Sequence, residues 1–587
     1  MAHLDGNPYL GGKKMDNKNI KFEDIKPKKV SLPKIQAKLE ELTKQLSDAK
    51  DAKEALKVIK ALEKYMDKYE NNATVISINY SLNTNDKYIE KLQDHMDEIS
   101  PMISNEINKF NKVLVKHKFR KELEEKLTPY YFQMIDNSLK SFDEKIIPEL
   151  IEINKLSSQY DKIMGGAQIE FRGEIYNLPQ MGKFANSKDR ETRREAAIAV
   201  DKFFQANEKN IGEIYGNLVL LRDKSAKKLG FKNYTELGYL SLGRVDYDAK
   251  MVAGYRKQIA NDVVPICQKL YKEQAARIGI PFNKMLSFDY NLSFLSGNPT
   301  PKGDAKHLVE KATKMYNEMS KETGEFFALM KDHHLLDLEA RAGKQPGGYM
   351  TFLPIQKFPF IFANFNGTEH DVNVLTHEVG HAFQGYLSRN IKPGDFRSPT
   401  LESCEIHSMS MEFFAWPWME LFFEEDSEKY KYHHLADSIE FLPYGITIDE
   451  FQHWVYEHPT ATHDERCAAY KEIESRYTPH KKYDPEMKIC QKGGWWMRQS
   501  HIFGVPFYYI DYTLAQVCAF QFLVEMTRNR EKAWKKYVKL CKLGGRYPFV
   551  TLLQKAHLRN PFEDGNIHKV MTPLKGILKS FDLSKIK

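Results

Sequence analysis

The chain has 587 residues with 28% charged side chains, and its net charge is only +8. This length exceeds what one compact core holds, so we expect two or more packed units or one large helical body. So dilute a charge predicts no nucleic-acid partner, and the lack of an apolar stretch of the roughly 18 to 20 residues that span a bilayer predicts no membrane partner. The six cysteines form no CxxC pair, which predicts a cytoplasmic protein.

The N-terminal part of the chain has a helical pattern. Residues 1–18, which include MAHLDGNPYLGGKK, are expected to be an appended leader or a disordered tail. From about residue 32 to 160 apolar residues recur at helical spacing, for example Leu39, Leu42 and Leu46. The stretch GGAQIEFRGEIYNLP (165–179) alternates and predicts a hairpin, after which Ser187 is expected to cap a helix. A change of pattern places a helical N-terminal lobe at 19–200 and a second lobe at 201–587.

An aromatic segment precedes the most informative motif of the chain. Residues 347–367, GGYMTFLPIQKFPFIFANFNG, carry no charge apart from Lys357. Residues 358–365 are predicted to be extended. Two interpretations stay open at this point: a buried strand without a ligand, or a strand that lines a neighbouring site.

The motif NVLTHEVGHAF (373–383) carries two histidines four positions apart. Apolar residues recur every three to four positions over 374–389, so the segment should be helical. On a helix, positions four apart lie about 40° from each other, so His377 and His381 project together and can hold two corners of a zinc shell. Glu378 lies off that direction but within reach of a water at the metal. The alternative is a helix with two incidental imidazoles.

A zinc site needs a third ligand, and the next predicted helix, SPTLESCEIHSMSMEFFAWP, offers three glutamates. Glu402, Glu405 and Glu412 fall near one face, whereas His407 points away from Glu405. Spacing alone favours a carboxylate and does not choose among the three. If Glu405 binds the metal, Glu412 is a candidate partner for a ligand imidazole, with a solvated or structurally paired role as the alternative.

HEVGHAF, the pattern from Glu405 to Glu412 and HIFGVPFYYIDYTLAQ (501–516) together resemble the thimet-oligopeptidase and oligoendopeptidase-F family of zinc peptidases, especially its bacterial Pz-peptidase branch. The resemblance extends from about residue 160 onward. It implies a mainly α fold in which a deep substrate channel divides a large helical body, with a small β element beside the zinc site. It also implies that Glu405 is the third ligand of one zinc ion, with Ser408 and Glu412 completing the ExxSxxxE pattern.

The same resemblance implies that His501, Tyr512 and one of Tyr508 and Tyr509 face the substrate carbonyl. Considered without it, Tyr508 or Tyr509 shares a helix face with Tyr512, which also fits a structural role. The sequence leaves the choice between Tyr508 and Tyr509 open.

These observations together predict a zinc endopeptidase that cuts internal bonds of short, unstructured peptides. Glu378 is expected to serve as general base and acid, and His501 and Tyr512 to donate hydrogen bonds to the developing oxyanion. The extended run would hold the peptide by strand addition at Phe362, Ala363 and Asn364. A related helical zinc carboxypeptidase and a non-catalytic peptide-binding protein are the alternatives, and no oligomeric state is indicated.

Overall fold

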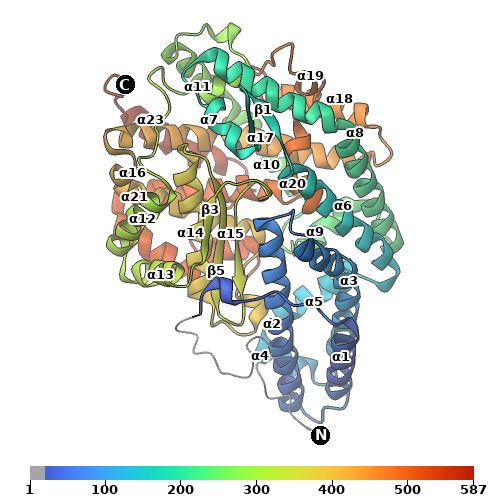
Figure 1. Cartoon of the computed structure of the whole chain (residues 1–587). Helices are drawn as coiled ribbons and strands as arrows, with labels where there is room; N and C mark the ends of the chain where they lie inside the picture. The colour runs from blue at the N-terminus through green and yellow to red at the C-terminus, as the bar shows by residue number, and fades with distance from the viewer. Residues whose placement is uncertain (1–19, 587) are drawn as a thin grey trace.

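The structure is a computed structural model that describes residues 20–586, so the predicted leader at residues 1–18 lies outside the described residues. The described chain is mainly helical and contains two small sheets, which confirms the predicted fold class (Figure 1). In residues 20–586 no helix combines the length and the apolar character that crossing a membrane demands.

The N-terminal helices pack through the apolar positions that the sequence pattern indicated. Leu39, Leu42 and Leu46 are at most 1% exposed, and each lies in a buried cluster between neighbouring helices. The N-terminal helices are α1 (Leu32–Ser47), α2 (Ala52–Leu82), α3 (Lys87–Val115), α4 (Arg120–Leu127), α5 (Pro129–Ser141) and α6 (Ile147–Gly165). The first five form the end of the molecule that lies farthest from the C-terminus, and α6 lies beside α8 (Arg190–Leu229) and α20 (Ser500–Gly504) (Figure 1).

The predicted hairpin is confirmed. Strands β1 (Ile169–Phe171) and β2 (Glu174–Tyr176) pair antiparallel around a two-residue turn. Both turn residues, Arg172 and Gly173, have positive φ angles of 52° and 87°, which is the backbone that a tight hairpin of this hand requires.

The long helix after the hairpin is capped differently from the prediction. The short α7 (Gly182–Ala185) precedes α8 (Arg190–Leu229), whose N-cap is Asp189. The Asp189 carboxylate accepts the Thr192 N–H at 2.8 Å, whereas Ser187 accepts the N–H of Asp189 itself. The cap prediction was therefore two residues early, because the carboxylate reaches the first free N–H groups of the helix. The lobe boundary at residue 200 stays a prediction, and that position lies inside α8.

A three-stranded sheet comes after five further helices. The helices are α9 (Tyr234–Ser241), α10 (Ala249–Asp262), α11 (Val264–Arg277), α12 (Ala305–Met319) and α13 (Lys321–Asp332). The strands are β3 (Leu336–Glu339), β4 (Tyr349–Leu353) and β5 (Phe358–Phe365). Their order is β3-β5-β4, with β3 parallel and β4 antiparallel to β5, so the strand that was predicted to be extended is the central one.

The helix with the two histidines, α14 (His370–Ser388), follows β5 after one short turn and packs on α15 (Leu401–Phe414). Gly380 makes this contact close: a Cβ at that position would lie 2.6 Å from the carbonyl oxygen of His407. The two backbones can therefore approach more closely than side chains would normally permit. Helix α21 (Tyr509–Leu543) packs on both α15 and α14.

The remaining helices complete the body around these two. They are α16 (Glu420–Phe423), α17 (Ser427–Glu457), α18 (His463–Tyr477), α19 (Lys488–Lys492), α20 (Ser500–Gly504), α21 (Tyr509–Leu543), α22 (Phe549–Lys555) and α23 (Asn566–Ser580). Helix α17 also packs against α21, so α14, α15, α17 and α21 form a connected group of neighbours. This group holds the site described next.

Candidate metal centre

Three potential ligands from two helices meet at one point. The Nε2 atoms of His377 and His381 lie 3.1 and 3.2 Å from Oε2 of Glu405. The imidazoles come from successive turns of α14, and the carboxylate comes from α15 at the close contact that Gly380 permits. Burial alone would raise the pKa of Glu405, but the two imidazoles hold this pKa well below its ordinary value. The arrangement gathers two nitrogen donors around one ionised oxygen donor.

The geometry fits a catalytic rather than a structural zinc ion. Among residues 20–586, these three form the one group of three or more His, Cys, Asp and Glu side chains whose donor atoms all lie within 4.8 Å of one another. Structural zinc sites close all four positions with protein ligands, whereas catalytic sites leave one open. The His377 side chain is 19% exposed and the His381 side chain 12%, so solvent reaches the cluster.

Glu378 lies beside the cluster without belonging to it. Its side chain is buried, and its Oε2 atom has no hydrogen-bond partner in the described chain. Burial raises the pKa of Glu378 above its ordinary value, and the two neighbouring imidazoles counteract the rise. A carboxylate of this kind is suited to accept a proton.

Glu412 bonds a ligand imidazole, as the sequence allowed. Its Oε1 atom lies 2.7 Å from Nδ1 of His377, and its Oε2 atom lies 2.7 Å from Nε2 of His434. The Trp416 indole N–H in turn donates to Nδ1 of His434 at 2.9 Å. This series of hydrogen bonds engages Nδ1 of His377 and leaves its Nε2 atom, which lies beside Glu405, to bind a metal. His434 was missed because only the fold brings this residue of α17 beside Glu412, and Trp416 joins the network only through His434.

The other two candidates on α15 lie away from the cluster. Both carboxylate oxygens of Glu402 are buried and have no hydrogen-bond partner among residues 20–586, and burial raises the pKa of Glu402 to about 7 against the opposing charge of Arg244. His407 is buried on the opposite side, with Nδ1 3.5 Å from the Cys541 sulfur. The ligand cluster therefore contains Glu405 alone among the acids of α15.

The predicted late segment forms one wall of the site. His501 Nε2 lies 3.0 Å from the Tyr512 hydroxyl, and the Tyr508 hydroxyl donates to Oε1 of Glu405. Tyr509 instead packs edge-on against Phe441 and Tyr444. Of the two tyrosines that the sequence could not separate, Tyr508 contacts the metal cluster.

The predicted strand addition to β5 is wrong. Strand β3 pairs with one edge of this strand, and β4 pairs with the other edge from Phe358 to Phe362. Phe362 and Ala363 are at most 1% exposed, and the Asn364 amide is used to donate to the carbonyls of Gln345 and Gly347. The sequence feature that was overlooked is the Gly347-Gly348-Tyr349 stretch, which leads into β4. A Cβ on Gly348 would lie 3.4 Å from Oε1 of Glu378, so this edge strand borders the site.

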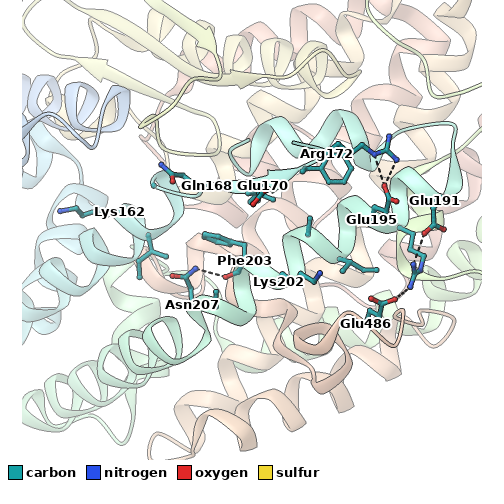
Figure 2. A pocket seen from close by; sticks show the side chains of 18 residues that line it. Lys162, Gln168, Glu170, Arg172, Glu191, Glu195, Lys202, Phe203, Asn207 and Glu486 are labelled. Atoms are coloured by element: carbon teal, nitrogen blue, oxygen red, sulfur yellow. Dashed lines mark hydrogen bonds and ion pairs between the residues drawn. The ribbon is translucent and has the colours of Figure 1, made fainter. Parts of the chain in front are cut away.

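A separate cavity of about 1000 Å³ lies between the end of α6, the β1–β2 hairpin and the first half of α8 (Figure 2). Its charged lining is largely self-paired: Arg172 bonds Glu195, and Arg194 bonds Glu191 and Glu486. None of the predicted site residues lines it. The metal cluster and this cavity are therefore distinct features.

Comparison with known proteins places the chain in a family. The model of the peptidase M3 N-terminal domain matches residues 22–142, and that of peptidase family M3 matches residues 183–572. No curated protein matches the chain.

Solved structures with a similar sequence include Pz peptidase A with an inhibitor, at 45% identity and a TM-score of 0.94 over 96% of this chain and 100% of the other. A Bacillus anthracis protein described as an oligoendopeptidase F has 42% identity and a TM-score of 0.90 over 96% and 99%. Oligoendopeptidase-F from Enterococcus faecium, at 15% identity and a TM-score of 0.62 over 94% and 98%, shares the fold. The chain therefore belongs to peptidase family M3 and is a metallopeptidase.

Proposed function

We propose that this metallopeptidase is a zinc-dependent endopeptidase that hydrolyses internal bonds of short, unstructured peptides. The observation that carries the proposal is the convergence of His377, His381 and Glu405, with Glu378 buried beside them. One zinc ion per chain would be held by these three ligands. Similarity to Pz peptidase A and to proteins described as oligoendopeptidase F supports the choice of short peptides as substrates.

The bound ion would supply Lewis acidity, which lowers the pKa of water and polarises the scissile carbonyl. The proton transfers are assigned to side chains of the protein. Glu378 accepts a proton from the attacking water and returns it to the departing amine, since its raised pKa suits both steps. The Glu412 carboxylate orients the His377 ring throughout.

The wall formed by His501 and Tyr512 would act on the carbonyl oxygen. As negative charge develops there, the Tyr512 hydroxyl donates a hydrogen bond, with His501 bonded behind it. Tyr508 bonds the ligand carboxylate, and Tyr509 is assigned to packing against α17 and not to direct contact with the reacting carbonyl.

The peptide main chain is assigned to the open edge of β4. Strand β4 has one neighbour in the sheet, and Gly348 borders Glu378 at its start. Pairing through the main chain would account for cleavage of many sequences. A cytoplasmic location belongs to the same proposal and is supported by six free cysteines.

Internally quenched peptides of graded length test this function, with and without a chelator, followed by mass analysis of the products. We expect zinc-dependent internal cleavage with an upper limit on peptide length. Release of terminal residues alone would favour a carboxypeptidase, and tight binding without cleavage would favour a peptide-binding protein. Glu378→Gln should retain zinc and lose hydrolysis, and near-normal turnover of this variant would remove Glu378 from its role.

A further inference from the structure

The oxyanion wall belongs to a continuous chain of hydrogen bonds that begins outside the metal site. His501 Nε2 lies 3.0 Å from the Tyr512 hydroxyl, and His501 Nδ1 lies 2.7 Å from the side-chain nitrogen of Gln499. The Gln499 oxygen lies 2.9 Å from the hydroxyl of Tyr444 on α17. Gln499 is half-buried and immediately precedes α20, the helix that carries His501.

The far end of this chain fixes the orientation of the Gln499 amide. The Tyr444 hydroxyl donates its hydrogen to the Gln499 oxygen. Consequently the amide nitrogen of Gln499 is the end that faces His501, and it donates to Nδ1.

The near end of the chain is the Tyr512 hydroxyl beside the metal cluster. The Tyr508 hydroxyl donates its hydrogen to Glu405, and the centroids of the Tyr508 and Tyr512 rings lie 5.0 Å apart. The direction set at Gln499 therefore runs through His501 to the Tyr512 oxygen, which leaves the Tyr512 hydrogen available to the site.

We propose that Gln499 is a positioning residue that selects the tautomer of His501 with hydrogen on Nε2, so that the Tyr512 hydroxyl directs its hydrogen toward the metal site. In this tautomer Nδ1 accepts from Gln499, and Nε2 donates to the Tyr512 oxygen. The Tyr512 hydroxyl can then donate its hydrogen bond to the substrate oxygen during turnover. This inference rests on the proposed peptidase mechanism and adds the device that orients its oxyanion donor.

A neutral imidazole is required for this arrangement. Burial lowers the pKa of His501 to about 4, although the charge of Glu405 works in the other direction. His501 therefore has one hydrogen at neutral pH, and its neighbours decide which nitrogen carries it. The titratable groups that surround it are Glu405 on α15, Tyr444 on α17, and Tyr508, Tyr509 and Tyr512 of the α21 end.

Two substitutions of equal size separate this role from simple packing. In Gln499→Glu a carboxylate faces Nδ1 and draws the hydrogen to that nitrogen, so Nε2 becomes an acceptor and takes the Tyr512 hydrogen. We expect kcat to fall on the order of 10²-fold, as for Tyr512→Phe, with little change in KM. Gln499→Met removes the hydrogen bond without reversing it, so its fall in kcat should be smaller.

The pH profile gives a readout that packing would not move. When the carboxylate introduced by Gln499→Glu is protonated, or when the imidazole is doubly protonated beside it, Nε2 carries hydrogen again. The ratio of the kcat of Gln499→Glu to that of the unchanged enzyme should therefore rise as pH falls. Glu378 and the metal site titrate in both enzymes, so their contributions cancel in this ratio.

A double-mutant cycle and a matched control complete the test. Adding Tyr512→Phe to Gln499→Glu should reduce kcat little further, because the Tyr512 hydrogen is already engaged. Gln268 and His480 form a similar pair outside the site, with the Gln268 nitrogen 2.6 Å from His480 Nδ1. Gln268→Glu should leave kcat unchanged.

The outcomes separate failure of this inference from failure of the proposed function. Equal activity of Gln499→Glu and Gln499→Met, additive effects with Tyr512→Phe, or a pH-independent ratio would each overturn the role of Gln499. If the unchanged, zinc-loaded enzyme cleaves no peptide, the proposed function itself fails. Zinc content, measured for every variant, should remain at one ion per chain.

Discussion

Oε1 of Glu412 lies 2.7 Å from Nδ1 of His377, on the side of the ring opposite the ligand cluster. This contact fixes which imidazole nitrogen keeps its hydrogen, and it joins α14 to α15 one turn from the close contact at Gly380. His434 bonds the second oxygen of the same carboxylate, so the orienting group is itself held in place.

Replacing Glu412 with Gln should weaken zinc binding by about 10- to 100-fold, because a neutral amide oxygen polarises and holds the His377 ring less well than a carboxylate does. Competition with a chromophoric chelator measures the affinity. The matched control is Glu531→Gln, which changes an exposed glutamate at the far end of α21 and should leave the affinity unchanged. Equal affinities in the two variants would contradict the orienting role.

Glu405 and Glu402 should respond differently to the same substitution. Glu405→Gln removes the ionised ligand and is expected to leave the purified protein with little zinc. Glu402→Gln should keep one ion per chain, since Glu402 lies outside the ligand cluster. Metal analysis after dialysis distinguishes them, and retention of zinc by Glu405→Gln would move the third ligand elsewhere.

Gly380→Ala should separate α14 from α15. The added methyl group would lie 2.6 Å from the His407 oxygen, so the helices must move apart and Glu405 must withdraw from the imidazoles. We expect a loss of stability of about 1 to 3 kcal/mol together with weaker zinc binding. The control is Gly254→Ala in α10, where a Cβ meets nothing within 4 Å and the substitution should stabilise slightly. Normal zinc affinity in Gly380→Ala would show that the helices need not be so close.

The stability of the chain should decline as Asp161 ionises. Burial and the neighbouring Asp97 raise the pKa of Asp161 from 3.8 to about 7, while a hydrogen bond from Gln345 opposes the rise. The folded state binds this proton more tightly than the unfolded state does. The contribution of the proton to the free energy of unfolding is therefore fully present below about pH 4 and is lost as pH rises to about 7.

Asp161→Asn should remove this dependence and stabilise the chain at pH 8 by about 1 to 2 kcal/mol, which is less than the full shift implies because the residue is half-buried. Thermal unfolding at pH 5 and pH 8 gives the comparison. Asp332→Asn, at an exposed position that ends α13, is the control and should show no such change. A variant less stable than the unchanged chain at pH 8 would reverse the sign of the argument.

Local sequence patterns were enough to predict the helical class, the β1–β2 hairpin and the shared face of His377 and His381. These features depend on residues within a few positions of one another. The prediction for β5 was half right: the run 358–365 is extended, but its place in the sheet depends on pairing with β3, which lies well before it in the chain. The same distant pairing contradicts strand addition of a substrate to β5, on which the choice of Phe362, Ala363 and Asn364 depended.

The sequence by itself determined that the chain is mainly helical, and that two imidazoles project together with a glutamate beside them, because helical periodicity is a local property. Only the tertiary structure decided which glutamate of α15 meets them and which of Tyr508 and Tyr509 faces the metal cluster. It also decided that Gln499 bonds His501 and that Tyr444 bonds Gln499. These choices depend on how closely and at what angle whole helices pack, and that geometry comes from contacts between segments far apart in the chain.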